Sequence, residues 1–528
     1  MLTLHTTRAR NAHRECKHVP IIVDTLKPFL LWAKQTPNDY PNLKLIISIM
    51  NKKALVVVLG ELARSPRMQY HCISLAKNNY DVTVIATRSG SKPDFSCENL
   101  ENNQNIRQVL MNDSVDFKKY LPNALAYIIK PIWQALLLIY HLCIISLNHV
   151  IIVQNPPSIP TLPILYIYSL ISRSKLIVDW HNYGYTILSL NLHPNHVFVR
   201  LSKVIEFMFG RLAHAGFCVS EAMQKDLRDD HQVRYPLIVL YDRPPKHFKP
   251  LSLKEKHDFF VKIQNEIPEF KSSIKDYFGR DKIPTTHSET RFTMTDVSKP
   301  HAILPKPDRP AILMSSTSWT EDEDFSLLLR ALQQYDQTVT NQLNLDPDDV
   351  EKRLPELLCV ITGKGPLKSY YENKIREIKF EHIQVVLPWL SATDYAKMVG
   401  SCDLGVSLHN SSSGVDLPMK VVDLFGCGIP VVAYKYPAIG ELVIDNKYGL
   451  TFTDSQDLFH QLINMLSDFY LEDSPHYKSE LSPMARYRRD IRKYFLVSRW
   501  EDNWNRRARP LIERLSVATN TTATMTTN

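Results

Sequence analysis

Glycine and cysteine are both scarce in this chain of 528 residues, which contains only 15 glycines and 8 cysteines. The loop after the first apolar run has a single glycine, Gly60, and the chain has no G-x-G-x-x-G segment. This absence disfavours an NAD-dependent oxidoreductase, because the dinucleotide fingerprint needs those glycines for its tight turn. The cysteines form no C-x-x-C pair, which excludes zinc ribbons and disulfide scaffolds and favours a reducing compartment.

A large excess of charge is also lacking. The chain has 63 Lys and Arg against 55 Asp and Glu, so its net charge is 63 − 55 = +8. This surplus suits an anionic lipid surface or a phosphorylated ligand, and it is too dilute to indicate a nucleic-acid partner. Since 44% of the residues are hydrophobic, the chain is globular, and its length predicts two or three domains.

No apolar run reaches the ~20 residues that a membrane-spanning helix needs. The longest is Ile132–Leu147, which lies in a stretch from Pro131 to Ser172 that has no Asp, Glu, Lys or Arg. We expect this run to form a helix that lies in a membrane interface, with Ile132, Leu137 and Ile144 in contact with lipid. A wholly buried core helix is the alternative.

From residue 54 onward, short β-branched runs alternate with helical patterns, which is typical of βαβ units. The pattern predicts an α/β protein with two Rossmann-like, doubly wound domains that face a central cleft, followed by a C-terminal helix. The expected parts are a leader that is poorly ordered or a mis-called start (1–53), a first domain (54–250), a linker or insertion (251–309), a second domain (310–482), a helix (483–517) and a disordered tail (518–528).

Two loops at strand ends of the first domain carry side chains suited to acid–base chemistry. In one, Glu61 precedes two arginines at the start of a helix. There a carboxylate can act as a base and the cations can hold an anionic acceptor. The alternative is a surface ion pair between Glu61 and one of the arginines. We expect Arg64 and Arg67 to bind the acceptor, which is the substrate that would lose a proton to this base.

The other loop follows the apolar run Lys175–Trp180. Aromatic and polar side chains suit the faces and edges of sugars, and a histidine can exchange a proton near neutral pH. His181 is therefore the second catalytic candidate, and Asp179, Asn182 and Tyr183 are expected to contact the acceptor. A packed aromatic loop with a satisfied histidine is the alternative.

The second domain has a serine- and glycine-rich loop that leads into a helix near Pro418. Its hydroxyl and backbone N–H groups can cradle a diphosphate, and a carboxylate further along can accept two hydrogen bonds from a ribose. The acidic run Glu321–Asp324 is expected to cap the next helix, with a metal site as the alternative. The expected donor-binding residues are Gly363, Lys364, Ser412, Ser413, Gly414, Asp416, Lys420 and Asp423.

Six segments, spread in order over about residues 54–510, together resemble the chitobiosyldiphosphodolichol β-mannosyltransferase family. They are GELARSPRMQYH, VQNPPSIP, DWHNYGYTIL, STSWTEDEDF, ITGKGPL and SSSGVDLPMKVVDLFGCGIPVV. The second domain more distantly resembles GT-B glycosyltransferases with a Glu-x7-Glu motif. Asp423 matches the second glutamate of that motif, whereas the first falls at Val415, beside Asp416.

The resemblance implies a GT-B enzyme that transfers one mannose from GDP-mannose to the chitobiose unit of a dolichyl diphosphate. The linkage would be β-1,4, formed with inversion on the cytosolic face of the endoplasmic reticulum membrane. Inversion needs a base, for which we prefer Glu61 over His181. No metal or tightly bound cofactor is implied, and the divalent-ion requirement is open.

Implied partners are the dolichol-linked acceptor, the membrane and other mannosyltransferases of the same assembly route, with no nucleic acid. Relatives typically carry an N-terminal membrane anchor, and residues 1–53 do not supply a clear one. A catalytically silent scaffold subunit of the assembly complex is the alternative function.

Overall fold

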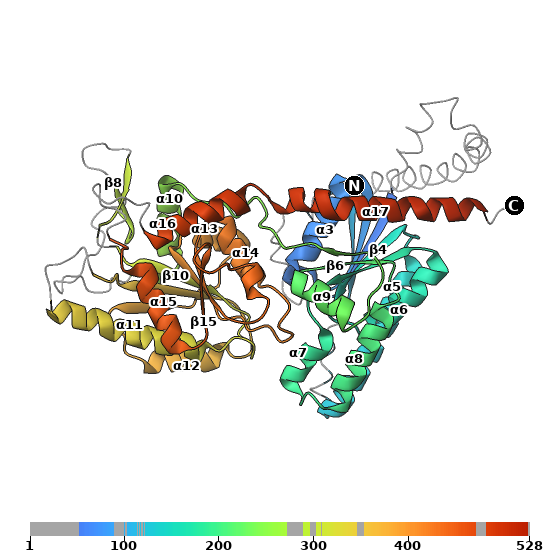
Figure 1. The fold of residues 1–528 in the computed structure, drawn as a ribbon, viewed down its shortest axis with the longest axis horizontal. Helices are drawn as coiled ribbons and strands as arrows, with labels where there is room; N and C mark the ends of the chain where they lie inside the picture. Colours follow the sequence, from blue (N-terminus) through green and yellow to red (C-terminus); the bar gives the residue numbers. More distant parts are fainter. Residues whose placement is uncertain are drawn as a thin grey trace, which may run out of the picture.

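The computed structural model describes residues 52–525 apart from 89–99, 101–102, several positions between 113 and 121, and 272–288, 296–301, 308, 346–352 and 471–481. The expected leader therefore lies almost wholly outside the described residues. Two α/β domains lie side by side along the long axis of the molecule (Figure 1).

The first domain is built on a sheet of parallel strands in the order β3-β2-β1-β4-β5-β6-β7. The interior strand β1 is buried between helices on both faces, which explains its continuous apolar sequence. Strand β3 was not predicted, because two polar residues interrupt its sequence IRQVLM, and it is only partly buried. The strands are β1 (Lys52–Glu61), β2 (Tyr80–Thr87), β3 (Ile106–Met111), β4 (Val150–Asn155), β5 (Lys175–Trp180), β6 (Ala215–Cys218) and β7 (Leu237–Val239). The helices are α3 (Pro66–Lys77), α5 (Asn123–Ile144), α6 (Thr161–Ser172), α7 (Gly184–Asn191), α8 (Val197–Gly210) and α9 (Glu221–Asp229).

The second domain repeats this plan with the parallel order β12-β11-β10-β13-β14-β15. In both sheets the order reverses beside the first strand of the domain, and ligands of such sheets bind at the carboxyl ends of the strands near that point. The strands are β10 (Ala311–Ser316), β11 (Leu357–Thr362), β12 (Ile383–Val386), β13 (Leu404–Ser407), β14 (Val431–Tyr434) and β15 (Gly449–Phe452). The helices are α11 (Phe325–Leu345), α12 (Lys368–Glu377), α13 (Ala392–Ser401), α14 (Met419–Gly426) and α15 (Ser455–Leu466).

Residues 251–309 were expected to form a solvated linker or an insertion, and the solvated linker is wrong for much of that segment. Helix α10 (Leu253–Glu266) begins with a capping box formed by Ser252 and Glu255, and it packs against α13. Its apolar side chains Phe259, Phe260 and Ile263 are buried in the core of the second domain. A short antiparallel pair, β8 (Thr293–Thr295) and β9 (Ile303–Pro305), follows.

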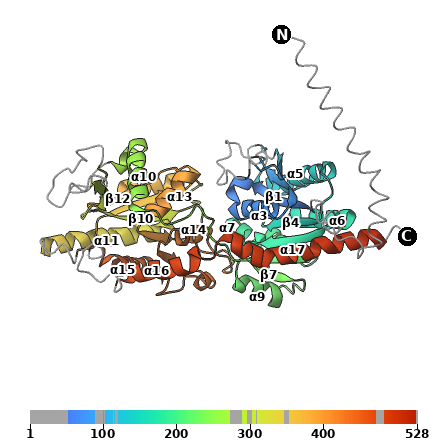
Figure 2. The same ribbon diagram turned by 90° about the horizontal axis from the view of Figure 1, so that it is seen from above.

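The C-terminal region is two helices rather than the expected single helix over 483–517. Helix α16 (Pro483–Ile491) and a π-helical segment (Arg492–Leu496) pack on the second domain, and α17 (Trp500–Met525) returns to the first. Figure 2 shows α17 lying along the first domain. Trp500, Trp504 and Leu511 are buried in its core. The helix continues through most of the expected tail, as far as Met525.

Helix α5 contains most of the apolar run that was expected to touch a membrane, and Pro131 lies inside it. Among the described residues, no helix has both the length and the apolar character needed to cross a bilayer. Ile132 and Ile144 are more than half exposed, Leu137 is partly buried and Leu138 is fully buried. The alternative of a wholly buried core helix is therefore wrong, because α5 buries only one side.

Candidate active site

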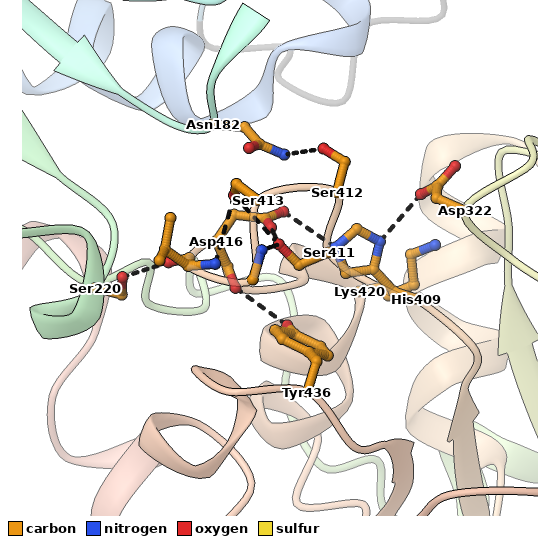
Figure 3. A network of polar contacts seen from close by, with 12 residues as sticks. Asn182, Ser220, Asp322, His409, Ser411, Ser412, Ser413, Asp416, Lys420 and Tyr436 are labelled. Atoms are coloured by element: carbon orange, nitrogen blue, oxygen red, sulfur yellow. Dashed lines mark hydrogen bonds and ion pairs between the residues drawn. The ribbon is translucent and has the colours of Figure 1, made fainter. Parts of the chain in front are cut away.

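Loops from the two domains meet where β5 and β13 end (Figure 3). Ser412 of the second domain lies within hydrogen-bonding distance of two side chains of the first, 3.0 Å from the Thr186 hydroxyl and 3.4 Å from the Asn182 amide nitrogen, which donates to it. The Ser220 hydroxyl donates to the carbonyl of Val415. The serine- and glycine-rich loop that is expected to bind the donor (the donor loop) thus directly faces the loop after β5 that is expected to bind the acceptor.

A histidine whose side chain is 15% exposed organises the donor loop. His409 follows β13, and its ring lies between two carboxylates, with Nδ1 3.2 Å from Asp322 and Nε2 3.0 Å from Asp416. Burial alone would lower the pKa of His409, but these carboxylates outweigh it and raise the pKa to about 9. His409 is therefore an imidazolium ion at neutral pH. The Ser411 hydroxyl also donates to Asp416 and accepts the N–H of Gly414 at 2.8 Å.

Asp324 and Glu323, in the acidic run before α11, have different roles. Asp324 caps the helix by accepting the N–H of Ser326 at 2.9 Å, as expected. Glu323 instead turns inward, is 2% exposed and forms an ion pair with Lys420. It also accepts hydrogen bonds from the Thr317 hydroxyl and the Ser318 N–H. In the part of the chain that the structure describes, no group of three His, Cys, Asp or Glu side chains is arranged to hold a metal ion.

The other expected donor residues lie at neighbouring strand ends. Gly363 follows β11 with φ +153°, and a Cβ there would lie 1.8 Å from the Thr317 carbonyl, so no side chain fits. Next to it, the Lys364 ammonium lies 3.7 Å from the centre of the Trp389 ring. Asp423 in α14 lies 3.3 Å from the Tyr395 hydroxyl, which donates to it, and burial raises the pKa of Asp423 to about 7.

On the first domain, Asp179 at the end of β5 is the centre of a buried polar cluster. Arg67 binds it with two parallel hydrogen bonds of 2.9 and 2.8 Å. His71 Nε2 and His181 Nε2 lie 3.1 and 2.9 Å from the same carboxylate oxygen, Oδ2. Arg67 and Asp179 are at most 1% exposed. The contacts of Arg67 and Asp179 with the acceptor stay predictions. In the structure these two side chains bind each other.

Glu61 and Arg64 form a surface ion pair of 3.0 Å, with the two side chains 32% and 78% exposed. This is the alternative that the sequence analysis left open for this loop. Tyr183 is only 2% exposed, its hydroxyl donates to Asp226, and its ring packs edge-on against Phe207. Its side chain is therefore part of the packing of the first domain and does not present a sugar-binding surface.

Sequence reasoning missed several side chains that complete the site. His409 and His71 are lone histidines in segments dominated by serines and apolar residues, so their chemistry depends on carboxylates that only the fold supplies. Glu441 accepts the N–H groups of Glu221 and Ala222 at the start of α9, both at 2.7 Å, and the Tyr241 hydroxyl at 2.8 Å. The one available signal was position, since His409 lies two residues after the end of β13.

Comparison with known proteins defines the class. Residues 296–479 match the family model described as glycosyl transferases group 1. The fold is similar to that of sucrose-phosphate synthase from Thermosynechococcus elongatus, with a TM-score of 0.54 and 11% identity, covering 90% of this chain and 98% of that one. A glycosyltransferase from Rickettsia africae gives 0.52 and 11%, covering 88% and 99%. At such identities the likeness concerns the fold alone. The chain is a glycosyltransferase with the GT-B fold.

Closer relatives identify the family within this class. Proteins from Homo sapiens and Dictyostelium discoideum, both named chitobiosyldiphosphodolichol beta-mannosyltransferase, are 39% and 38% identical over 461 and 479 residues. These alignments cover 87% and 86% of this chain and 92% of each relative. The UDP-glycosyltransferase TURAN of Arabidopsis thaliana is 38% identical over 475 residues, covering 88% of this chain and 97% of that protein. The chain belongs to the chitobiosyldiphosphodolichol beta-mannosyltransferase family, as its motifs predict.

Proposed function

We propose that this enzyme transfers one mannose from GDP-mannose to the chitobiose unit of a dolichyl diphosphate, forming a β-1,4 linkage with inversion. The observation that carries the proposal is the direct apposition of Ser412 with Asn182 and Thr186. It brings the phosphate-cradling loop next to a loop that carries a histidine–carboxylate pair. Transfer from a nucleotide sugar to a hydroxyl acceptor needs the diphosphate-binding loop and a possible base in one place.

In this scheme the diphosphate of the donor lies against the Ser411–Gly414 loop and the start of α14. The imidazolium of His409 and the ammonium of Lys420 supply positive charge for the leaving group. Glu323 holds Lys420 in place until the donor arrives. Asp423, deeper in α14, accepts hydrogen bonds from the ribose.

One assay tests this function. Labelled GDP-mannose is incubated with a chitobiosyl diphosphate lipid, and the product is treated with a β-mannosidase. A β-linked product supports the proposal, and absence of transfer contradicts it. UDP-sugars are assayed in parallel, because TURAN carries a different nucleotide in its name. Parallel reactions with Mg²⁺ and with EDTA measure the divalent-ion dependence.

We also propose that the enzyme works at the endoplasmic reticulum membrane, with both domains on the cytosolic side. The support is an apolar surface on the first domain, formed by α5, α6 and α8, which pack against one another (Figure 1). Lys130, Arg200 and Lys203 are exposed on α5 and α8, where they can meet anionic head groups. The exposed apolar side chains are Leu136, Ile139, Tyr140, Ile144, Ile167, Leu170, Ile171, Leu201, Val204 and Met208.

A further inference from the structure

His181 belongs to a chain of hydrogen bonds that starts at the C-terminal helix. The Trp504 indole nitrogen lies 3.0 Å from His71 Nδ1. His71 Nε2 lies 3.1 Å from Asp179 Oδ2, and the same oxygen lies 2.9 Å from His181 Nε2. Trp504, His71 and Asp179 are at most 1% exposed, whereas the His181 side chain is 22% exposed. The chain therefore runs from the core of the first domain to its surface.

The proton positions along this chain follow from the chemistry of its ends. An indole N–H can only donate, so His71 Nδ1 accepts, and its Nε2 must carry the hydrogen that is donated to Asp179. Burial lowers the pKa of His71, which keeps the ring neutral.

Asp179 is ionised and can only accept hydrogen bonds. Burial alone would raise its pKa, but the charge of Arg67 outweighs this effect and holds the pKa well below the ordinary value. The Arg67 guanidinium is held in turn by Asp242 and by the Leu240 carbonyl, at 2.8 and 2.7 Å. Because Asp179 accepts, His181 Nε2 is a donor.

In neutral His181, this assignment leaves Nδ1 with an unprotonated lone pair. No hydrogen bond to Nδ1 is found within the described ranges. We propose that His181 Nδ1 takes the proton of the acceptor hydroxyl, and that His71 and Trp504 are positioning residues that act through Asp179. This inference rests on the proposed function. It differs from the preference for Glu61, whose carboxylate is paired with Arg64 at the surface.

The step balances as a single displacement. The acceptor hydroxyl loses its proton to His181 Nδ1 while its oxygen forms a bond to C1 of mannose. The bond from C1 to the β-phosphate oxygen breaks, and its electron pair leaves with the nucleoside diphosphate. The proton then passes from His181 to water, which restores the neutral ring.

The first test concerns the base itself. His181→Ala should lower kcat about 10²–10⁴-fold, the usual loss for a general base, with the KM for GDP-mannose nearly unchanged. Added imidazole should restore part of the turnover of this variant. Full turnover in His181→Ala, or a loss on Glu61→Gln that exceeds it, would overturn the assignment. A wild-type chain that transfers no mannose would instead contradict the proposed function.

The second test concerns the positioning residues. Trp504→Phe replaces the indole with a smaller aromatic ring that has no N–H donor, so kcat should fall about 5-fold without a change in KM. Trp500→Phe is the matched control, because its ring also packs on His71, with 5.4 Å between ring centres, but its N–H donates to the Ser74 hydroxyl, at 3.0 Å, and not to a member of the hydrogen-bond chain. His71→Gln, which can accept at one end of its amide and donate at the other, should keep more turnover than His71→Leu. Equal kcat in all four variants would refute the positioning role.

A third measurement does not depend on activity. In protein with ¹⁵N-labelled histidine, the His181 signals, identified by their loss in His181→Ala, should show a protonated Nε2 and an unprotonated Nδ1. His71 should show the same tautomer, and in Trp504→Phe its Nδ1 signal should shift because the indole donor is lost, while Nε2 stays protonated against Asp179. The opposite tautomer at His181 would overturn the inference even if the wild-type enzyme transfers mannose.

Discussion

At the scale of single residues, the donor loop depends on a charge that its own sequence does not reveal. His409 lies between Asp322 and Asp416, which raise its pKa to about 9 although burial opposes the charge. Since this value lies above the ordinary 6.5, the charged form stabilises the folded protein fully below pH 6.5. That contribution to the free energy of unfolding is lost as the pH rises to about 9.

The same titration should govern nucleotide binding. We expect the affinity of the wild-type enzyme for GDP to fall about tenfold as the pH rises from 7 to above 9, because a charged partner of the diphosphate becomes neutral. Calorimetric titration at several pH values measures this effect. His409→Gln should bind GDP more weakly at pH 7 and show little further loss. Parallel pH curves for the two proteins would contradict this role of His409.

Asp423 gives a second prediction at this scale. Asp423→Ala should weaken GDP-mannose binding by ~1–3 kcal/mol, because a hydrogen-bond acceptor is taken from a ribose hydroxyl in a partly buried place. The readout is the dissociation constant for GDP-mannose compared with that for inorganic diphosphate, which lacks the ribose. Equal losses for both ligands would show that Asp423 supports the loop rather than the ribose.

At the scale of elements, α5 shows what its sequence could and could not predict. Its charge-free run predicts an apolar helix, but only the structure shows which side is buried. Leu138 and Leu142 point into the core, whereas Leu136 and Tyr140 are about 60% exposed. A surface of this kind, continued over α6 and α8, is unusual for a protein that is surrounded only by water.

The exposed side of α5 supplies the membrane prediction. Leu136→Glu together with Tyr140→Glu should move the protein from membranes to the soluble fraction and lower turnover with long-chain acceptors, because two charges would enter the lipid interface. Sedimentation with vesicles that contain anionic lipid measures the first effect. Leu138→Glu is the matched contrast and should unfold the first domain. Unchanged sedimentation of the folded double variant would rule out this surface as the membrane contact.

Most strands of both domains were predictable because continuous apolar runs such as Ala54–Leu59 must be buried on both faces, whereas β3 and β15 were not predicted. The serine loop was predictable because its residues are consecutive. The cluster around Asp179 could not be predicted, because His71 and Trp504 lie 433 positions apart in the sequence and only the packing of the fold brings them together. Helix α10 was missed because Lys, Glu and Asp on its exposed side hide an apolar spacing at Phe259, Phe260 and Ile263.

At the scale of the whole molecule, the two domains are joined by contacts as well as by the chain. Glu441 of the second domain accepts two N–H groups at the first turn of α9 in the first domain, which also places a negative charge at the positive end of that helix. Ser412 makes the neighbouring contacts. Val415 and Met419 of the second domain also pack against the core of the first, so both polar and apolar contacts set the relative position of the donor loop and His181.

Loss of the Glu441 contacts should separate the domains. Glu441→Ala should increase the radius of gyration in X-ray scattering and lower kcat/KM for the acceptor, because hydrogen bonds to a charged group contribute about 2 kcal/mol. Affinity for GDP should change little, since the expected donor residues all lie in the second domain. Glu377→Ala, in an exposed pair with Lys374 on α12, is the control. An unchanged scattering profile and kcat/KM would contradict this prediction.

The return of α17 to the first domain has a consequence for protein synthesis. The core of the first domain is completed by Trp500, Trp504 and Leu511, which the ribosome adds about 260 positions after the last core strand residues near Leu240. At ordinary rates of translation, that interval is on the order of tens of seconds. During this time the groove that α17 will fill is open on the nascent chain. A chaperone that binds apolar surfaces should therefore associate with the growing polypeptide until the last helix emerges, and a premature stop before Trp500 should leave it bound.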